Sequence, residues 1–276
     1  MRIIKDILHS IHSLLKIVYK GNLKSLSQFT RVKPERILYI LGNGKSLNDV
    51  QLSADDNVDC LVVNRHVLSD SYVAIEPKHY VLADPHFFQH PEGIDVLKRI
   101  NNVTSWNLTL YVPYAKFVKG IVNENITNQN IKIVYYNTYS FKGFKSIKYF
   151  LYKTQLSMPV VQNVLVAAIM IGILSQYKRI KLYGVEHTWT KYLFVEKDNV
   201  VYLENPHFFD KDKVGAKPVK EIQHTDEYPF YLILENYSRM FKSYWEIKEW
   251  IKDDNINIQV VNKTPGSFID AFFKDY

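Results

Sequence analysis

The sequence is poor in cysteine and has no long hydrophobic run, and each absence excludes a class of protein. Cys60 is the single cysteine among 276 residues, so an internal disulfide is impossible and a reducing compartment is expected. The longest apolar stretch, residues 164–174, has about half of the roughly 20 residues that a membrane-spanning helix needs. The N-terminus also lacks the small-residue cleavage site of a signal peptide. We therefore predict a cytoplasmic protein, with peripheral attachment to the inner membrane left open.

Several familiar cofactor motifs are missing as well. The sequence has no HExxH motif and no closely spaced Cys/His ligand pattern, so a zinc site is not expected. The spacing from Gly42 to Lys45 is too short for a P-loop, and no third glycine completes a Rossmann fingerprint. Asp210-Lys211-Asp212 matches the Asp-x-Asp pattern that binds divalent cations, but its lysine-rich surroundings favour a solvated surface. We expect no metal and no other cofactor.

The composition is that of a globular protein with a basic surface. Hydrophobic residues make up 47% and charged residues 23%, and the net charge is +7, so a nucleotide or a lipid headgroup is a natural partner. The basic residues are spread along the chain without an Arg-rich run, so no nucleic-acid partner is expected. Homo-oligomer formation stays open.

Residues 1–26 have the pattern of an amphipathic helix, which we treat as an N-terminal segment, 1–30, ahead of a single domain, 31–276. Two interpretations remain for its apolar face. A basic amphipathic helix can lie in the interface of an anionic membrane, or it can pack on the core of its own domain. The apolar positions that follow the helical period are Ile3, Ile4, Ile7, Leu8, Ile11, Leu14, Leu15 and Val18.

The rest of the chain alternates between short apolar runs and helical patterns, which predicts an α/β fold with a doubly wound, mostly parallel, Rossmann-like sheet. Residues 185–228 are polar and show no sustained period, so we expect a lid-like loop. Strands are predicted at 37–41, 60–63, 79–83, 108–112, 131–135, 179–183 and 257–261, and helices after Leu47 through Leu52 and at 160–176, 231–252 and 267–273.

Polar residues follow the predicted strands, and ligands of parallel sheets bind at the carboxyl ends of their strands. The first loop, Gly42–Leu47, can bring backbone amides close to a ligand, and a helix starting after it would suit a phosphate. Asn and Asp at such positions can instead cap helices, so that alternative stays open. The proposed nucleotide-binding residues are Gly42, Asn43, Gly44, Ser46, Asn64, Arg65, Asp84, Gln162, Asn163, Gly184 and Glu186.

Transfer of a group to a hydroxyl requires a base that deprotonates that hydroxyl. A histidine with a pKa of ~6.5 suits this task. His207, in the sequence Asn205–Phe209, is our candidate, with a plain surface histidine as the alternative.

The segment Ile37–Val50, ILYILGNGKSLNDV, resembles the first strand and Gly-Asn-Gly-x-Ser-Leu loop of the bacterial sialyltransferases of glycosyltransferase family 42. The same loop is similar to that of the motor accessory factor glycosyltransferases and of a hydroxymethylpterin pyrophosphokinase-like group. Further similarity lies at Asn64, at Ala83–Pro85, at Gly184 and over residues 262–270. This resemblance implies a GT-A variant fold and metal-independent, inverting transfer from a CMP-activated sugar.

The resemblance also implies roles for individual residues. His207 matches the loop position of the family's general base. The family places tyrosines behind the Gly-x-Asp/Glu turn to support the departing phosphate, whereas this chain has His187 there and Tyr192 as the nearest tyrosine. Our catalytic candidates are therefore His207, Tyr192 and His187. Because this chain also lacks the family's Arg-Ile-Thr-Ser-Gly segment, the donor sugar is open among sialic acid, a related nonulosonic acid and Kdo.

We therefore predict transfer from a CMP-sugar donor to an oligosaccharide or a lipid-linked glycan acceptor, in capsule or lipopolysaccharide assembly. Residues 1–26 would hold the enzyme at the inner-membrane surface. Two other functions are kept: a pyrophosphokinase-like enzyme that uses Mg-ATP, and a non-catalytic nucleotide-sugar-binding protein.

Overall fold

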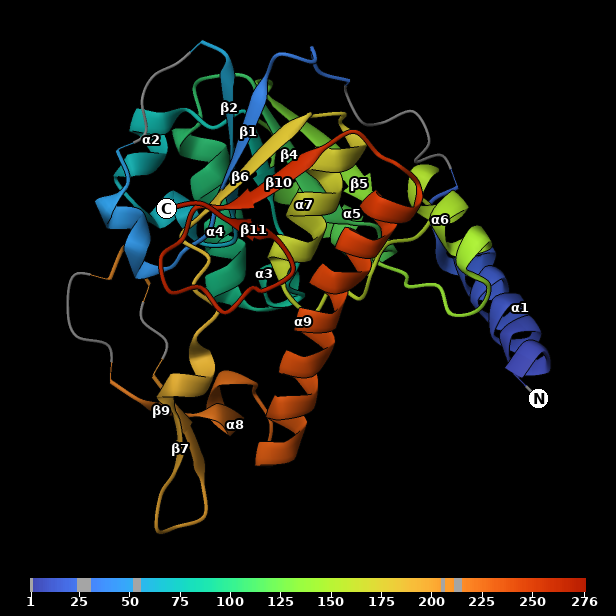
Figure 1. The fold of residues 1–276 in the computed structure, drawn as a ribbon. Coiled ribbons are helices and arrows are strands. Elements are labelled where there is room, and N and C mark those ends of the chain that lie inside the picture. The colour runs from blue at the N-terminus through green and yellow to red at the C-terminus, as the bar shows by residue number, and fades with distance from the viewer. Residues whose placement is uncertain (1, 24–30, 52–55, 205–206, 211–214) are drawn as a thin grey trace.

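The computed structural model describes residues 2–23, 31–51, 56–204, 207–210 and 215–276. Its centre is a sheet of eight parallel strands with helices on both faces (Figure 1). The predicted α/β class with a parallel sheet is thus confirmed. In spatial order the strands are β11 (Phe273–Lys274), β10 (Gln259–Asn262), β6 (Arg179–Tyr183), β1 (Ile37–Leu41), β2 (Val58–Val63), β3 (His79–Val81), β4 (Leu108–Pro113) and β5 (Ile131–Tyr136).

Strand β1 lies at the point where the chain changes direction across the sheet. It pairs with β2 on one side and with β6 on the other, so Ile37 is level with both Val58 and Arg179. Its side chains enter opposite layers: Leu38 joins one hydrophobic core and Leu41 the other. Burial on both faces explains why this strand is an uninterrupted apolar run.

Two layers of helices cover the sheet. The layer around Leu38 contains α6 (Lys145–Lys153), α7 (Val164–Leu174) and α9 (Phe230–Asp253). The opposite layer contains α2 (Ser71–Ile75), α3 (His86–Gln89), α4 (Pro91–Val103) and α5 (Lys116–Asn125). Helix α7 is buried almost all round because it lies between the sheet and α9, which explains why its sequence is apolar on every side.

Residues 185–228, called the insertion below, differ from the expected loop. They contain a three-stranded antiparallel sheet, β7 (Leu193–Val195), β8 (Val201–Leu203) and β9 (Lys217–Pro218), with the short helices η4 (Trp189–Tyr192) and α8 (Val219–Ile222). Figure 1 shows this small sheet projecting below the large one. Its strands have two or three residues each, too few to produce a detectable sequence period.

The predicted closing helix at 267–273 is wrong. Residues 267–272 are irregular and lead directly into β11. The hydroxyl of Ser267 accepts a hydrogen bond from the Asn262 side chain and donates one to the Val185 carbonyl oxygen. The Phe268 amide donates to the Glu186 carbonyl oxygen. These bonds hold the segment against the end of β6.

The helix predicted after Leu47 is displaced toward the N-terminus, because it begins within the first loop and ends before residue 50. It is a 3-10 helix, η2 (Lys45–Asp49), and residue 52 lies outside the described residues. A second 3-10 helix, η3 (His66–Leu68), follows β2. At the N-terminus, α1 (Arg2–Lys20) ends six residues before the predicted limit, and residues 24–26 lie outside the described residues. In the described part of the chain, no helix has both the length and the hydrophobicity to cross a membrane.

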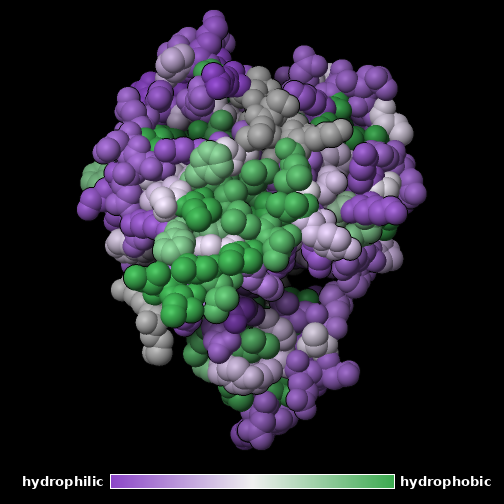
Figure 2. Space-filling view, turned by 90° about the vertical axis from the view of Figure 1, so that its right-hand side faces the viewer, coloured by the Kyte–Doolittle hydropathy of each residue, from purple (hydrophilic) through white to green (hydrophobic). Residues whose placement is uncertain are grey.

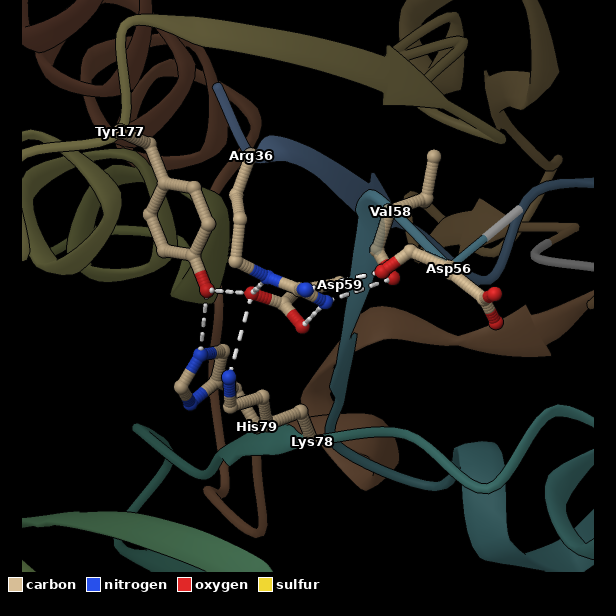
Figure 3. A network of polar contacts seen from close by, with 7 residues as sticks. All are labelled: Arg36, Asp56, Val58, Asp59, Lys78, His79 and Tyr177. Atoms are coloured by element: carbon tan, nitrogen blue, oxygen red, sulfur yellow. Dashed lines mark hydrogen bonds and ion pairs between the residues drawn. The ribbon is translucent and has the colours of Figure 1, made fainter. Parts of the chain in front are cut away.

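The amino edge of the sheet is closed by a polar network around Asp59 (Figure 3). Its carboxylate, 3% exposed, is held by the Arg36 guanidinium and accepts the Tyr177 hydroxyl at 2.6 Å. His79 Nε2 is 2.8 Å from the same hydroxyl. Burial opposes the charged form, but the hydrogen bonds from Arg36 and Tyr177 and the charge of Lys78 hold the pKa of Asp59 below its usual value. The network ties β2 and β3 to the segments that precede β1 and β6.

Candidate functional site

A cleft of about 610 Å³ lies at the opposite, carboxyl edge of the sheet, between the ends of β1, β2, β3 and β6 and the insertion. The crevice at the change of strand order is where parallel α/β sheets bind ligands. Ser46 and Arg65 are the predicted site residues that do not line it. The predicted residues that do line it are Gly42, Asn43, Gly44, Asn64, Asp84, Gln162, Asn163, Gly184, Glu186, His187, Tyr192 and His207.

Two glycines allow the ends of β1 and β6 to approach closely. A methyl group on Gly42 would lie 2.2 Å from the Gly184 carbonyl oxygen. Gly184 itself has a φ of +62°, a conformation that L side chains rarely adopt. The Gly42 amide donates to the Tyr183 carbonyl oxygen at 2.8 Å, and the Gly44 amide donates to the Gly184 carbonyl oxygen at 2.9 Å. The first loop is thereby fixed to the end of β6.

Glu186 occupies the place where the sequence suggested a phosphate. One of its carboxylate oxygens accepts the Ser46 amide at 2.6 Å, and a methyl group on Gly44 would lie 1.5 Å from the other. Ser46 is the second residue of the five-residue η2, so an amide in the first turn of this helix already binds a carboxylate. The Glu186 carboxylate thus occupies the Ser46 amide at this helix start, and phosphate binding here stays a prediction.

Four buried polar atoms around this loop lack a hydrogen-bond partner in the described structure. They are Asn43 Oδ1, Ser46 Oγ, Asn64 Oδ1 and Glu186 Oε2. Buried polar atoms in folded proteins are nearly always satisfied. Asn43 is held in place because its amide nitrogen donates to the Val63 carbonyl oxygen at 3.2 Å, and Asn64 is held with a φ of +51° at the end of β2. Of these four residues, Asn43, Asn64 and Glu186 line the cleft, whereas Ser46 does not.

Two predicted nucleotide-binding residues cap a helix or a turn, the alternative that the sequence left open. Asn163 caps α7, since its side-chain oxygen accepts the Leu165 amide at 2.9 Å. The Asp84 carboxylate accepts the His86 amide at 2.9 Å in a short turn. Both residues still line the cleft, and the exposed neighbour Gln162 lines it too. Whether any of the three contacts a nucleotide stays a prediction.

His207 is attached to the first loop through the next residue along the chain. The Phe208 amide donates to the Asn43 carbonyl oxygen at 3.0 Å, and the Asn48 side chain donates to the Phe208 carbonyl oxygen at 3.1 Å. Burial lowers the pKa of His207 below its ordinary value; nearby Asp210 opposes this shift and Arg65 adds to it. A neutral imidazole at the cleft wall can accept a proton. Asn205 and Pro206 lie outside the described residues.

The other two catalytic candidates, His187 and Tyr192, differ in their exposure. His187 is buried, its Nε2 lies 2.7 Å from the Tyr244 hydroxyl, and burial lowers its pKa to about 3. Its contacts favour an internal structural pair over a proton acceptor. Tyr192, at the end of η4, is 41% exposed and lines the cleft, so its hydroxyl is accessible.

The sequence analysis did not identify the aromatic and acidic residues on the far wall. Trp189 of η4 and Tyr237 of α9 line the cleft with their rings stacked 5.7 Å apart. Glu204 adds a third carboxylate to those of Asp84 and Glu186, against a single lysine in the lining, Lys45. Tyr237 lies in a long helix with an ordinary amphipathic pattern, so no sequence signal marked it as a site residue.

Arg65 and three histidines form a separate cluster beside the cleft. The ring nitrogens of His86, His90 and His224 lie within 4.8 Å of one another, a grouping that could hold a metal ion. The sequence did not predict this cluster, because His224 comes from the insertion. Arg65, predicted to bind nucleotide, directs its Nη2 to His86 Nε2 at 3.1 Å. That cation disfavours a metal at the same nitrogen.

No family model matches the chain, and no curated protein matches it significantly. Among solved structures it is similar to the monofunctional α-2,3-sialyltransferase Cst-I from Campylobacter jejuni. The identity is 15%, the match covers 90% of this chain and 82% of the other, and the TM-score is 0.46. A likeness of this degree carries no conclusion about the reaction. The functional assignment depends on the site itself.

Proposed function

We propose that this protein is a metal-independent, inverting glycosyltransferase that binds a CMP-activated sugar in the cleft and transfers the sugar to a hydroxyl of a glycan acceptor. The observation that carries the proposal is that unsatisfied polar atoms and a candidate base meet where the insertion contacts the first loop. Asn43 Oδ1 and Glu186 Oε2 lack partners in the described structure, and the Asn43 carbonyl oxygen anchors the segment that bears His207.

The chemistry of the unsatisfied atoms supports a cytidine ligand. Asn43 Oδ1, Asn64 Oδ1 and Glu186 Oε2 can only accept hydrogen bonds in these positions. The ligand must therefore present N–H and O–H groups. A cytidine offers such groups in its exocyclic amine and its two ribose hydroxyls. A phosphate alone presents acceptors and would be repelled by Glu186.

The cleft also has groups suited to the rest of the donor. Lys45 and the accessible hydroxyl of Tyr192 can stabilise negative charge on the departing CMP phosphate. The stacked rings of Trp189 and Tyr237 offer an apolar face for the sugar. Sialic acid, a related nonulosonic acid and Kdo remain the candidate sugars.

The transfer step is a single displacement. The acceptor hydroxyl oxygen attacks the anomeric carbon while the bond from that carbon to the CMP phosphate oxygen breaks, and CMP leaves with the bonding electrons. The acceptor proton passes to the neutral imidazole of His207, whose pKa is lowered by burial. Attack from the side opposite the leaving group inverts the anomeric configuration.

Binding and turnover measurements test the proposal together. Thermal shifts with CMP, CDP, UMP, UDP, GDP and ATP, each with and without Mg²⁺, should show stabilisation by CMP without metal. His207→Ala should lower transfer from CMP-sialic acid or CMP-Kdo by roughly 10²–10⁴-fold and keep the CMP affinity. His12→Ala, at an exposed position of α1, is the matched control.

One observation favours the Mg-ATP alternative: three carboxylates, Asp84, Glu186 and Glu204, line the cleft. Stabilisation by ATP only in the presence of Mg²⁺ would support that enzyme and overturn the transferase. A non-catalytic nucleotide-sugar-binding protein would bind CMP with no turnover for His207→Ala to remove.

A further inference from the structure

The apolar face of α1 points away from the protein. Figure 2 shows a large hydrophobic patch on the side of the molecule where α1 lies. On this face of the helix the apolar side chains are between 42% and 67% exposed. They are Ile3, Ile4, Ile7, Leu8, Ile11, Leu15 and Val18, called the α1 apolar face below. Contiguous exposed apolar surface of this kind marks an interaction site.

The helix is fixed to the protein by its polar side. The Ser10 hydroxyl accepts the Phe144 amide at 3.1 Å, and the Ser13 hydroxyl accepts the Lys142 amide at 3.1 Å. A methyl group on Gly143 would lie 2.1 Å from Ser10 Oγ, so the helix packs closely on this turn. Ile17 is the fully buried apolar residue of the helix. The orientation of α1 is thus set by specific contacts, and these contacts leave its apolar face in solvent.

Basic residues border this face on one side, and one of them, Lys16, also places its Nζ 5.6 Å from the centroid of the Tyr139 ring. At roughly 100° per residue, His12, Lys5 and Lys16 follow one another directly beyond the apolar arc, and all three are exposed. Asp6 is the one acidic residue of the helix. An apolar stripe with a lysine border is the arrangement of helices that lie in the plane of a membrane interface.

We infer that α1 binds the surface of an anionic lipid bilayer, with its apolar face at the boundary between headgroups and acyl chains and with Lys5 and Lys16 at the headgroups. The 19 residues of α1 include Asp6 and several lysines, and among the described residues no helix can cross a membrane, so α1 lies flat. Charge favours a bilayer over a second copy: two chains of net charge +7 repel each other, whereas anionic lipids attract them.

Vesicle flotation of the full chain tests the apolar contact. Vesicles of phosphatidylcholine with phosphatidylglycerol should carry the wild-type chain, and Ile4→Gln/Ile11→Gln should weaken this binding by about tenfold or more. Val73→Gln/Phe117→Gln replaces two similarly exposed apolar residues on α2 and α5 and should bind like the wild type. Both pairs are on the surface, and unchanged thermal unfolding checks that each variant folds.

A second pair of variants tests the charge. Lys5→Gln/Lys16→Gln should weaken binding to the anionic vesicles by roughly five-fold per lysine, and pure phosphatidylcholine vesicles should bind the wild type less than the anionic ones. CMP affinity should be unchanged in all variants, so this test is independent of the proposed reaction. Failure of the wild type to float, or flotation that Ile4→Gln/Ile11→Gln does not reduce, overturns the inference. A concentration-dependent dimer that Ile4→Gln/Ile11→Gln abolishes also overturns the inference, because the α1 apolar face would then bind a second copy of the chain.

Discussion

The Ser46 amide donates to the Glu186 carboxylate at 2.6 Å, so the first loop of the sheet is completed by a side chain 140 positions further along the chain. One carboxylate oxygen binds the loop, and the other, Oε2, has no partner in the described structure. Glu186 therefore acts in two ways in our proposal: it shapes the loop and presents an acceptor to the ligand.

Replacing Glu186 with glutamine separates these two roles. In Glu186→Gln the side-chain carbonyl oxygen can still accept the Ser46 amide, so we expect little change in thermal stability. The second oxygen becomes an amide nitrogen, which cannot accept a hydrogen bond from cytidine, and CMP affinity should fall by roughly 10- to 100-fold. Isothermal titration calorimetry measures this, with exposed Glu92→Gln as the control. Unchanged CMP affinity would remove Glu186 from the binding site.

Gly42→Ala should damage both the fold and the site. Its methyl group would lie 2.2 Å from the Gly184 carbonyl oxygen, which is backbone and cannot rotate away. We expect a loss of about 1–3 kcal/mol in the free energy of unfolding, together with weaker CMP binding. The contrast is Gly120→Ala in helix α5, where a methyl group meets nothing within 4 Å and should stabilise the helix by about 0.5–1 kcal/mol. Chemical denaturation of both variants gives the comparison.

The pH dependence of transfer should reveal the titration of His207, the proposed general base. The folded protein lowers the pKa of His207 below 6.5, and only the neutral imidazole accepts a proton. The value of kcat/KM should therefore rise with pH and reach its plateau through an apparent pKa below 6.5. His207→Ala should abolish this acid limb along with most of the activity. An acid limb that persists in the residual rate of the variant would assign the titration to another group.

Asp59→Asn should destabilise the sheet without touching the cleft. The change leaves the Arg36 guanidinium without its carboxylate, and breaking a largely buried pair costs about 3–5 kcal/mol. Because the pKa of Asp59 is lowered in the folded state, its contribution is complete above the unfolded pKa of ~3.9 and is lost as the pH falls through the folded value.

The difference in stability between wild type and Asp59→Asn should therefore shrink below about pH 4. Thermal unfolding across this range measures it, with Asp95→Asn, which removes an exposed ion pair, as the control. A difference that stays constant from neutral to acidic pH would contradict the assigned pKa shift.

Local pattern located seven of the eight strands of the large sheet, and β11 was missed. Residues 37–41 and 179–183 coincide with β1 and β6, because a strand buried on both faces must be largely apolar. The helix predicted at 267–273 is absent, and the hydrogen bonds of Ser267 to Asn262 and to the Val185 carbonyl oxygen hold this segment in an irregular conformation. The small sheet of the insertion is held by pairing between segments too short to carry a period.

The site could be predicted in outline and not in its contacts. Asn43, Asn64 and Gly184 follow strands, so the topology alone brings them together at one edge. The contact of Glu186 with the first loop and the stacking of Trp189 on Tyr237 depend on how separate segments pack. Likewise, the sequence showed that the first helix has an apolar face, but only its hydrogen bonds to residues 142–144 decide which way that face points.

The bond from the Phe208 amide to the Asn43 carbonyl oxygen has a consequence for the order of the reaction. The loop proposed to hold the donor also positions the proposed base, so we expect donor binding and the position of the base to be coupled. We therefore predict that the nucleotide sugar binds first and the acceptor second. Initial-rate kinetics should accordingly follow a compulsory sequence, with CMP competing against the donor and not against the acceptor.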